Sequence, residues 1–333
     1  MIQADLMQRA PLQRVRLPEY ERAGIELCVW RLDGIDAAAP GNKYFKLSEN
    51  LHAARAGGHD CVLSFGGAFS NHIHALALTG AAQGLRTIGL IRGEDIAQDN
   101  PTLRDARAAG MRLHFLGRDE YRRLCGVEGS AVCAELEARF GRCFIIPEGG
   151  ANALGAEGCR VLGAAIAAMP AAPDCVVLPC ATGSTLAGIV AGLGDRCAVN
   201  GIAVLKGGAA LRAALREKVR EWLAVLDAAA CQRWRIDTDD HCGGYARVPA
   251  ALAQFVARFT QDSGIAVEPV YSGKMLYAIH RRIERGEYAR GTRILALHTG
   301  GLQGARGFIY RRGQGASSAV AGGTGGRIRT ASQ

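Results

Sequence analysis

Lysine side chains are scarce in this chain, and a lysine amine is a group that can attack an aldehyde. Only five of the 40 basic residues are lysines: Lys43, Lys46, Lys206, Lys218 and Lys274. Lys43 follows Gly41-Asn42 at a predicted junction between a loop and a helix that begins near Leu47. A solvated lysine there is an ordinary surface residue, whereas a desolvated one has a lowered pKa and is nucleophilic. The sequence leaves both interpretations of Lys43 open.

Three glycine-rich loops follow predicted strands and could bind anions. The loop at 64–72 can expose backbone amides at the start of a helix, and the loop at 181–188 adds the hydroxyls of Thr182, Ser184 and Thr185. Amides at a helix N-terminus bind phosphate or carboxylate groups. The third loop, 297–301, contains His298. The simpler interpretations are helix caps and tight turns, and a structural role for a lone histidine.

Several other classes of protein are disfavoured by what the sequence lacks. It has no Walker A ending, no dinucleotide-binding Gly-x-Gly-x-x-Gly after a strand and no Gly-x-Ser-x-Gly elbow. The eleven cysteines show no zinc-site spacing, so we expect reduced thiols and no metal; Cys61, Cys175 and Cys180 lie in apolar runs. The net charge of +9 is dispersed over helical faces, which indicates a solvated surface and not nucleic-acid binding.

The N-terminal segment carries charges throughout, and no apolar run is long enough to span a membrane. We therefore expect a cytoplasmic protein without a membrane partner. A composition of 49% hydrophobic and 21% charged residues over 333 residues is that of a globular chain with a large core.

The elements that position these loops alternate along the chain from residue 60 onward. Short apolar runs, glycine-rich turns and longer helical patterns indicate βαβ units in a doubly wound α/β fold, whose ligands bind beyond the carboxyl ends of the strands. Strands are predicted at 61–65, 87–91, 112–116, 143–147, 175–179, 201–205 and 294–298. Helices are predicted at 70–83, 102–109, 130–140, 156–169, 184–193, 210–229, 249–262 and 273–285. The Gly/Ser/Ala-rich segment 313–333 predicts a flexible tail.

Four motifs, at 41–47, 64–72, 182–185 and 269–274, occur in the order found in a known family. Together they resemble the D-cysteine desulfhydrase/1-aminocyclopropane-1-carboxylate (ACC) deaminase family of fold-type II pyridoxal-phosphate (PLP) enzymes, which are related to tryptophan synthase β. The resemblance implies an α/β fold with open, mostly parallel sheets flanked by helices. It also implies a small domain at 49–160, a large PLP-binding domain formed by 1–48 and 161–312, and a homodimer.

The resemblance assigns roles to individual residues. Lys43 matches the lysine that holds PLP as a Schiff base and then acts as the base. The other cofactor-binding matches are Lys46, Asn71, Thr182, Gly183, Ser184, Thr185 and Ser272. The matches for substrate binding are Ser70, Asn71, His72 and Tyr245. Tyr245 and Thr299 match residues that position the leaving group or a proton, whereas Lys274 is interpreted as a structural or surface residue.

Two positions distinguish the reactions of this family. Where this chain has Ser272 and Thr299, ACC deaminases have Glu and Leu. A carboxylate keeps the pyridine nitrogen of PLP protonated and makes the ring a strong electron sink, whereas a serine hydroxyl donates to a neutral nitrogen and gives a weaker one. The weaker sink is sufficient for β-elimination, because a good leaving group departs without a long-lived carbanion.

The expected reaction is therefore the elimination of a β-substituent from a small amino acid, with D-cysteine giving pyruvate, ammonia and sulfide. ACC deamination, another PLP-dependent lyase or racemase reaction, and a non-catalytic ligand-binding homologue remain alternatives. Tyr44-Phe45 and Ile73-His74 replace arginines that are common in relatives. These departures leave the identity of the substrate open.

Overall fold

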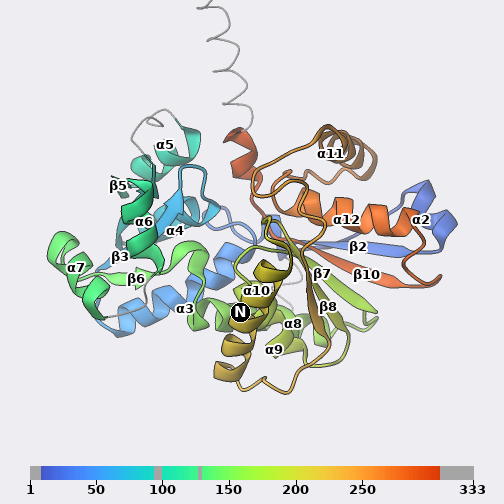
Figure 1. Cartoon of the computed structure of the whole chain (residues 1–333), viewed down its shortest axis with the longest axis horizontal. Helices are drawn as coiled ribbons and strands as arrows, with labels where there is room; N and C mark the ends of the chain where they lie inside the picture. Colours follow the sequence, from blue (N-terminus) through green and yellow to red (C-terminus); the bar gives the residue numbers. More distant parts are fainter. Residues whose placement is uncertain (1–8, 94–99, 127–129, 308–333) are drawn as a thin grey trace, which may run out of the picture.

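The computed structural model of the chain describes residues 9–93, 100–126 and 130–307 (Figure 1). The predicted flexible tail at 313–333 lies outside these residues. Two parallel-rich sheets organise the fold, one on each side of the molecule in the view of Figure 1. No helix in the described part of the chain has the length and apolar character needed to cross a membrane.

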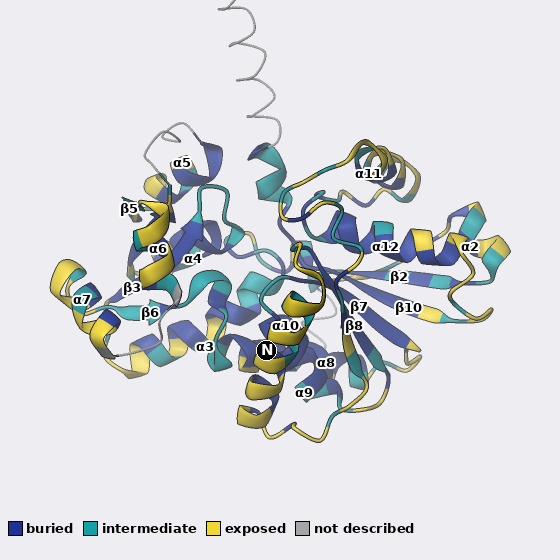
Figure 2. Ribbon diagram, in the orientation of Figure 1, coloured by how far each residue is buried: buried dark blue, intermediate teal, exposed yellow. Residues whose placement is uncertain are grey.

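The larger sheet has six strands in the order β1-β2-β10-β7-β8-β9. Their bounds are β1 Leu12–Val15, β2 Glu26–Arg31, β7 Cys175–Cys180, β8 Ala198–Ala203, β9 Trp234–Asp237 and β10 Arg293–His298. Only the edge strand β1 runs antiparallel to its neighbour; the others pair in parallel. Apolar clusters cover both faces of this sheet, which explains the nearly continuous burial of β7 and β10 in Figure 2.

The smaller sheet has four parallel strands in the order β5-β4-β3-β6. They are β3 Cys61–Gly67, β4 Arg86–Arg92, β5 Arg112–Leu116 and β6 Phe144–Ile146. All four fall within the segment predicted as the small domain. Two further apolar clusters cover the faces of this sheet, so it has a core of its own.

Helices flank both sheets. The bounds are α2 Pro18–Ala23, α3 Asn42–Ala56, α4 Asn71–Ala82, α5 Pro101–Ala108, α6 Arg118–Gly126, α7 Ser130–Phe140, α8 Ala153–Ala167, α9 Ser184–Leu193, α10 Gly208–Val225, α11 Ala250–Ser263 and α12 Ser272–Glu284. The short 3-10 turns are η1 Leu32–Gly34 and η3 Glu148–Gly150. The α/β architecture predicted from the sequence is confirmed.

Helices α8 and α9 cross at very short range because glycines face the partner backbone. A Cβ atom on Gly188 would lie 2.1 Å from the carbonyl oxygen of Ala156, and one on Gly163 would lie 2.1 Å from that of Ile189. Any larger side chain would force the helices apart. Helix α9 begins at the glycine-rich loop after β7, so this packing holds the N-terminus of α9 in place.

The structure corrects three details of the predicted elements. Helix α3 begins at Asn42 and not near Leu47, so Lys43 lies in its first turn. Strand β8 ends at Ala203, two residues before the predicted end, and begins at Ala198. Strands β1, β2 and β9 and helices α2 and α6 were not predicted; these segments are short, and short segments give a weak periodic signal.

Candidate active site

A cavity of about 540 Å³ opens at the carboxyl ends of strands from both sheets. It is lined by residues that follow β3, β6, β7 and β10 and by Arg92 at the end of β4, as expected for ligand sites in parallel α/β folds. The structure brings ten of the predicted site residues to its wall: Lys43, Lys46, Ser70, Asn71, His72, Thr182, Gly183, Thr185, Tyr245 and Thr299. Two predicted residues, Ser184 and Ser272, are buried but do not line the cavity.

The first turn of α3, which carries Lys43, is fixed by contacts to the loop that follows β10. Gly41 has a φ of 75°, and a Cβ there would lie 1.9 Å from the carbonyl oxygen of Thr299, so only glycine fits. The amide of Asn42 donates to that same carbonyl at 3.2 Å, and its side chain donates to Thr185 Oγ1 at 2.9 Å. These contacts place Lys43 between the β10 loop and the loop at the start of α9.

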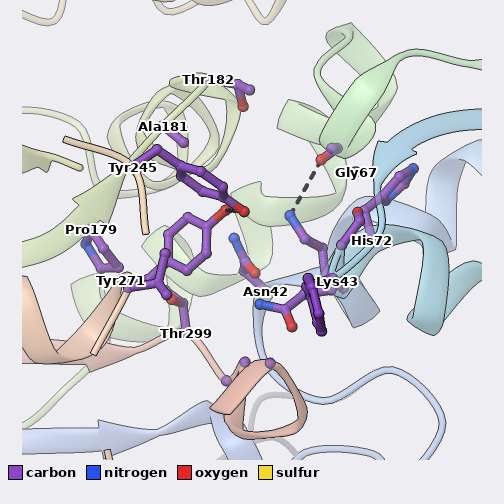
Figure 3. Close-up of a pocket in the computed structure, with 18 of the residues that line it drawn as sticks. Asn42, Lys43, Gly67, His72, Pro179, Ala181, Thr182, Tyr245, Tyr271 and Thr299 are labelled. Carbon is purple, nitrogen blue, oxygen red and sulfur yellow. Dashed lines mark hydrogen bonds between the residues drawn. The ribbon is translucent and has the colours of Figure 1, made fainter. Parts of the chain in front are cut away.

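The Lys43 amine points into the space also faced by the rings of Tyr245 and Tyr271 (Figure 3). Its Nζ atom donates to the carbonyl oxygen of Gly149 at 3.4 Å. The side chain is partly accessible, but only through the cavity, and the amine at its tip is desolvated. This burial, reinforced by the charge of Lys46, lowers the pKa of Lys43 well below its usual value. A neutral amine that faces a cavity is nucleophilic. The structure thus favours the second of the two interpretations of Lys43 that the sequence allowed.

The loop at the start of α9 offers amides and hydroxyls to the cavity. Gly183 caps the helix with a φ of 91°, a conformation that favours glycine, and Thr182 and Thr185 line the wall on either side of it. Ser184 instead turns away, with its hydroxyl 3.5 Å from the carbonyl oxygen of Gly150. The N-terminus of a helix with exposed amides binds phosphate. The start of α9 is joined to the first turn of α3, which carries Lys43, by the Asn42–Thr185 hydrogen bond.

A second helix N-terminus, that of α4, faces the cavity with Ser70, Asn71 and His72. The Ser70 hydroxyl caps the helix by accepting from the amide of Ile73 at 3.2 Å. Ser64 Oγ donates to the carbonyl oxygen of Ile146 at 2.7 Å, so it accepts from His72 Nε2, 2.9 Å away. Burial, followed by the charges of Lys43 and Lys46, lowers the pKa of His72. His72 is therefore neutral, and an anion here meets amides rather than a cation.

The side-chain amide of Asn71 is oriented by a residue that the sequence did not single out. Thr102 Oγ1 donates to Gln303 Oε1 at 2.9 Å, and Gln303 Nε2 donates in turn to Asn71 Oδ1. This chain of hydrogen bonds leaves the Asn71 NH2 group as a donor at the cavity wall. It also joins α4 and α5 of the smaller sheet to the segment that follows β10.

Tyr245 and Tyr271 meet across the cavity. Their ring centroids are 6.0 Å apart at an interplanar angle of 72°, and the Tyr271 hydroxyl lies 3.4 Å from that of Tyr245. Burial, followed by the neighbouring Tyr245, raises the pKa of Tyr271 well above its usual value. Lys274 is fully buried and stabilises the loop of Tyr245 by donating to the carbonyl oxygen of Gly244. Lys274 is thus a structural residue of α12, with no exposed surface.

Glu268 is a further residue of the cavity wall that the sequence did not single out. Its carboxylate accepts from the amides of Val270 and Ser272 at 2.6 Å each and from Tyr271 at 2.9 Å, capping α12. Burial raises the pKa of Glu268 to about 7, although the three amides oppose that shift. Ser272, four positions after Glu268, is fully buried, and its hydroxyl has no hydrogen-bond partner among the described residues.

These features fit bound PLP. The reactive amine and the anion-binding start of α9 suit the aldehyde and the phosphate of that cofactor, and the buried Ser272 hydroxyl, which has no partner among the described residues, directly follows the cavity-lining Tyr271. The fold and the cavity thus define a PLP-dependent α/β enzyme.

Comparison with known proteins agrees with this class. The chain belongs to the family described as "Pyridoxal-phosphate dependent enzyme", whose sequence pattern matches residues 5–300, and within it to the D-cysteine desulfhydrase/ACC deaminase group. It is 30% identical over 313 residues to the bifunctional D-cysteine desulfhydrase/ACC deaminase of Arabidopsis thaliana, covering 88% of this chain and 76% of that protein.

Two further relatives cover most of the chain. A putative ACC deaminase of Pyrococcus horikoshii is 28% identical over 293 residues, covering 86% of this chain and 88% of that protein. The crystal structure of an ACC deaminase homologue superposes with a TM-score of 0.79 at 27% identity, covering 93% of each chain. The predicted family, cofactor and enzymatic nature of the chain are confirmed.

Among the described residues, no group of three or more His, Cys, Asp or Glu side chains could hold a metal ion. Cys61, Cys175 and Cys180 are buried free thiols, as predicted. His298 is fully buried, with Nε2 donating to the carbonyl oxygen of Ala266 at 2.9 Å and Nδ1 accepting from the amide of Gly300 at 3.2 Å. Its role is therefore structural.

Proposed function

We propose that this enzyme removes the β-substituent of a small amino acid, with D-cysteine converted to pyruvate, ammonium and sulfide. The observation that carries the proposal is the desolvated Lys43 amine facing the paired hydroxyls of Tyr245 and Tyr271 across one cavity. A base on one side of a substrate and proton donors on the other are the groups that elimination needs. The names of the relatives, which include both activities of the family, support the same class of reaction.

PLP supplies an electron-withdrawing ring that stabilises negative charge at the substrate Cα. The lowered pKa of Lys43 favours the neutral amine, which would hold PLP and could serve as the base that takes the Cα proton of a bound substrate. Ser70, Asn71 and His72 offer the start of α4 to the substrate carboxylate. Tyr245 and Thr299 line the remaining wall, where they position the departing sulfur or deliver its proton.

We further propose that Lys46, Asn71 and Ser272 contact the cofactor and that the loop from Thr182 to Thr185 binds its phosphate. Ser272 bears on the choice of reaction. Its hydroxyl is available as a donor to the ring nitrogen, because no described residue uses it. The nearby carboxylate of Glu268 is already engaged by three backbone amides. A neutral donor at the ring nitrogen favours elimination over the opening of a cyclopropane ring.

Assembly and location complete the proposal. We propose a cytoplasmic homodimer in which residues 49–160 form the small domain and residues 1–48 with 161–312 form the large one. The four-stranded sheet with its own apolar clusters supports the first boundary. Light scattering of the purified protein tests the dimer.

Product analysis tests the function directly. PLP-loaded protein is incubated separately with D-cysteine, L-cysteine and ACC, and sulfide, pyruvate and α-ketobutyrate are measured. The proposal requires sulfide and pyruvate from D-cysteine at a higher kcat/KM than α-ketobutyrate from ACC. The reverse order would identify an ACC deaminase, which the names of the Pyrococcus relative and the superposed structure also suggest. Turnover of neither cysteine would overturn the proposal.

A further inference from the structure

Two oppositely charged side chains line the cavity beside the residues assigned to the reaction. Arg92 is the last residue of β4, and Glu148 begins η3 immediately after β6. Both lie at the carboxyl edge of the smaller sheet, where β3 separates their strands. Nothing in the elimination described above uses either of them.

Arg92 is available to a ligand. Its guanidinium carbon lies 5.5 Å from the ring centroid of Tyr121, and it forms no ion pair within residues 9–93, 100–126 and 130–307. Gly67 lies beside it on the cavity wall: a Cβ there would lie 3.6 Å from Arg92 Nη2, which is an ordinary contact distance. An unpaired guanidinium presents a planar fork of donors that matches a carboxylate.

Glu148 complements Arg92 with unused acceptors. Its carboxylate accepts a weak hydrogen bond from the thiol of Cys125, with Sγ 3.7 Å from Oε2. Tyr121 lies beside it on α6 and is only 3% exposed, and its hydroxyl has no hydrogen-bond partner in the described part of the chain. Burial, followed by the charge of Glu148, raises the pKa of Tyr121. The Glu148 carboxylate oxygens, with the Tyr121 hydroxyl oxygen beside them, can accept hydrogen bonds from an ammonium group.

We propose that Arg92 and Glu148 form a subsite for the leaving group, and that this leaving group is a thiol that is itself an α-amino acid. The carboxylate of the distal amino acid would pair with Arg92 and its ammonium with Glu148. A ligand with one charge would leave the other side chain unpaired, whereas a zwitterion satisfies both. The substrate class is thus a thioether of two amino acids. This inference rests on the proposed β-elimination.

The reaction balances in the same way as for cysteine. The Cα–H and Cβ–S bonds of the proximal amino acid break, and its Cα proton passes to Lys43. The sulfur leaves with the bonding electron pair and takes a proton, giving a free amino-acid thiol. One water is consumed as the remaining three-carbon unit becomes pyruvate and ammonium. No oxidant or reductant is required.

A matched set of cysteine thioethers separates the two charges. Lanthionine carries both distal groups, S-carboxymethylcysteine only the carboxylate, S-(2-aminoethyl)cysteine only the ammonium and S-ethylcysteine neither. Each is assayed for pyruvate, as the D and L forms (for lanthionine, its stereoisomers), and its dissociation constant is taken from the change in visible absorbance of the PLP-loaded protein. The wild type should prefer lanthionine over S-ethylcysteine by about tenfold or more in kcat/KM, as for one or two charge-assisted hydrogen bonds.

Two variants then test which side chain binds each charged group of the ligand. Arg92→Met should lower the preference for S-carboxymethylcysteine over S-ethylcysteine by about tenfold and leave the preference for the aminoethyl compound in place. Glu148→Gln should lower the preference for the aminoethyl compound over S-ethylcysteine and leave the preference for S-carboxymethylcysteine in place. Arg92→Lys keeps the positive charge and should retain part of the preference for S-carboxymethylcysteine. Arg112→Met, at an exposed arginine of the same sheet outside the cavity, is the matched control.

The outcomes distinguish this inference from the proposed function. If cysteine is turned over but lanthionine has no advantage over S-ethylcysteine, the subsite is wrong and the elimination stands. If both variants change all thioether preferences equally, Arg92 and Glu148 do not bind separate charged groups of the ligand, and the assignment also fails. If neither cysteine nor any thioether yields pyruvate, the proposed function itself fails.

Discussion

The amines of Lys43 and Lys46 share one acceptor, the carbonyl oxygen of Gly149, at 3.4 and 3.1 Å. The two side chains lie one turn apart on α3, and Lys46 is 3% exposed. Two amines so close in a buried site cannot both be charged without cost. This relationship is a physical reason for the reactive state of Lys43, second to its own desolvation.

Removing the charge of Lys46 should therefore make Lys43 harder to deprotonate. In Lys46→Met, the pKa of Lys43 should rise, and the pH at which PLP attaches half-maximally to the cofactor-free protein should rise with it. Lys46→Arg keeps the charge and should keep the profile. The measurement is the rate of attachment, followed by absorbance, between pH 6 and 10. An unchanged profile in Lys46→Met would show that burial alone sets the pKa of Lys43.

Gln303 should control how Asn71 meets the cofactor. Gln303→Leu breaks the chain of hydrogen bonds from Thr102, so the Asn71 amide is no longer held with its NH2 group toward the cavity. We expect a shifted visible absorption maximum of the PLP-loaded protein and PLP affinity weaker by about threefold to tenfold. Thr102→Val should show a smaller shift in the same direction. A spectrum identical to that of the wild type in both variants would contradict the orienting role.

Ser272 should matter only when PLP is bound. Because its hydroxyl has no partner among the described residues, Ser272→Ala should change the free energy of unfolding of the cofactor-free protein by less than about 1 kcal/mol. PLP affinity should fall by about threefold to tenfold, and kcat for elimination should fall with it. Ser48→Ala, at an exposed serine of α3, is the control. Loss of stability without loss of affinity would assign Ser272 a purely structural role.

Glu268 should make stability depend on pH. Because the pKa of Glu268 is raised to about 7 in the folded protein, its protonated form favours folding, and that contribution is complete below its unfolded value and lost as the pH rises through about 7. Over that window the loss is about 3 kcal/mol. Glu268→Gln cannot ionise, so the wild type should lose stability relative to this variant between pH 4.5 and 8. Parallel curves of unfolding free energy against pH would refute the raised pKa.

Much of the fold and of the site could be predicted from local sequence. The glycine-rich loops at 64–72 and 181–188 predict both helix N-termini of the cavity. Glycine and capping residues determine the backbone conformation only a few positions away in the sequence. Short apolar runs likewise located every strand of the smaller sheet. These features depend on neighbours in the chain, which the sequence displays directly.

The residues that were missed act through distant contacts. Gln303 meets Asn71 across 232 positions, and Arg92 and Glu148 come together only because β4 and β6 flank the same strand. Tyr271 lies within the motif at 269–274, but its partner Tyr245 is in another loop. A carboxylate four positions before Ser272 could have suggested Glu268 as a helix cap. The burial that decides the state of Lys43 is likewise a property of the assembled cavity.

The most direct test of the account is to locate the PLP attachment site. PLP-loaded protein is reduced with borohydride, which makes the bond between cofactor and lysine permanent, and the digested peptides are analysed by mass spectrometry. Because Lys43 is the desolvated amine at the cavity wall, the account predicts one modified lysine, Lys43, and no label in Lys43→Ala. A label on Lys46, Lys206, Lys218 or Lys274 in the wild type, or none at all, would contradict it.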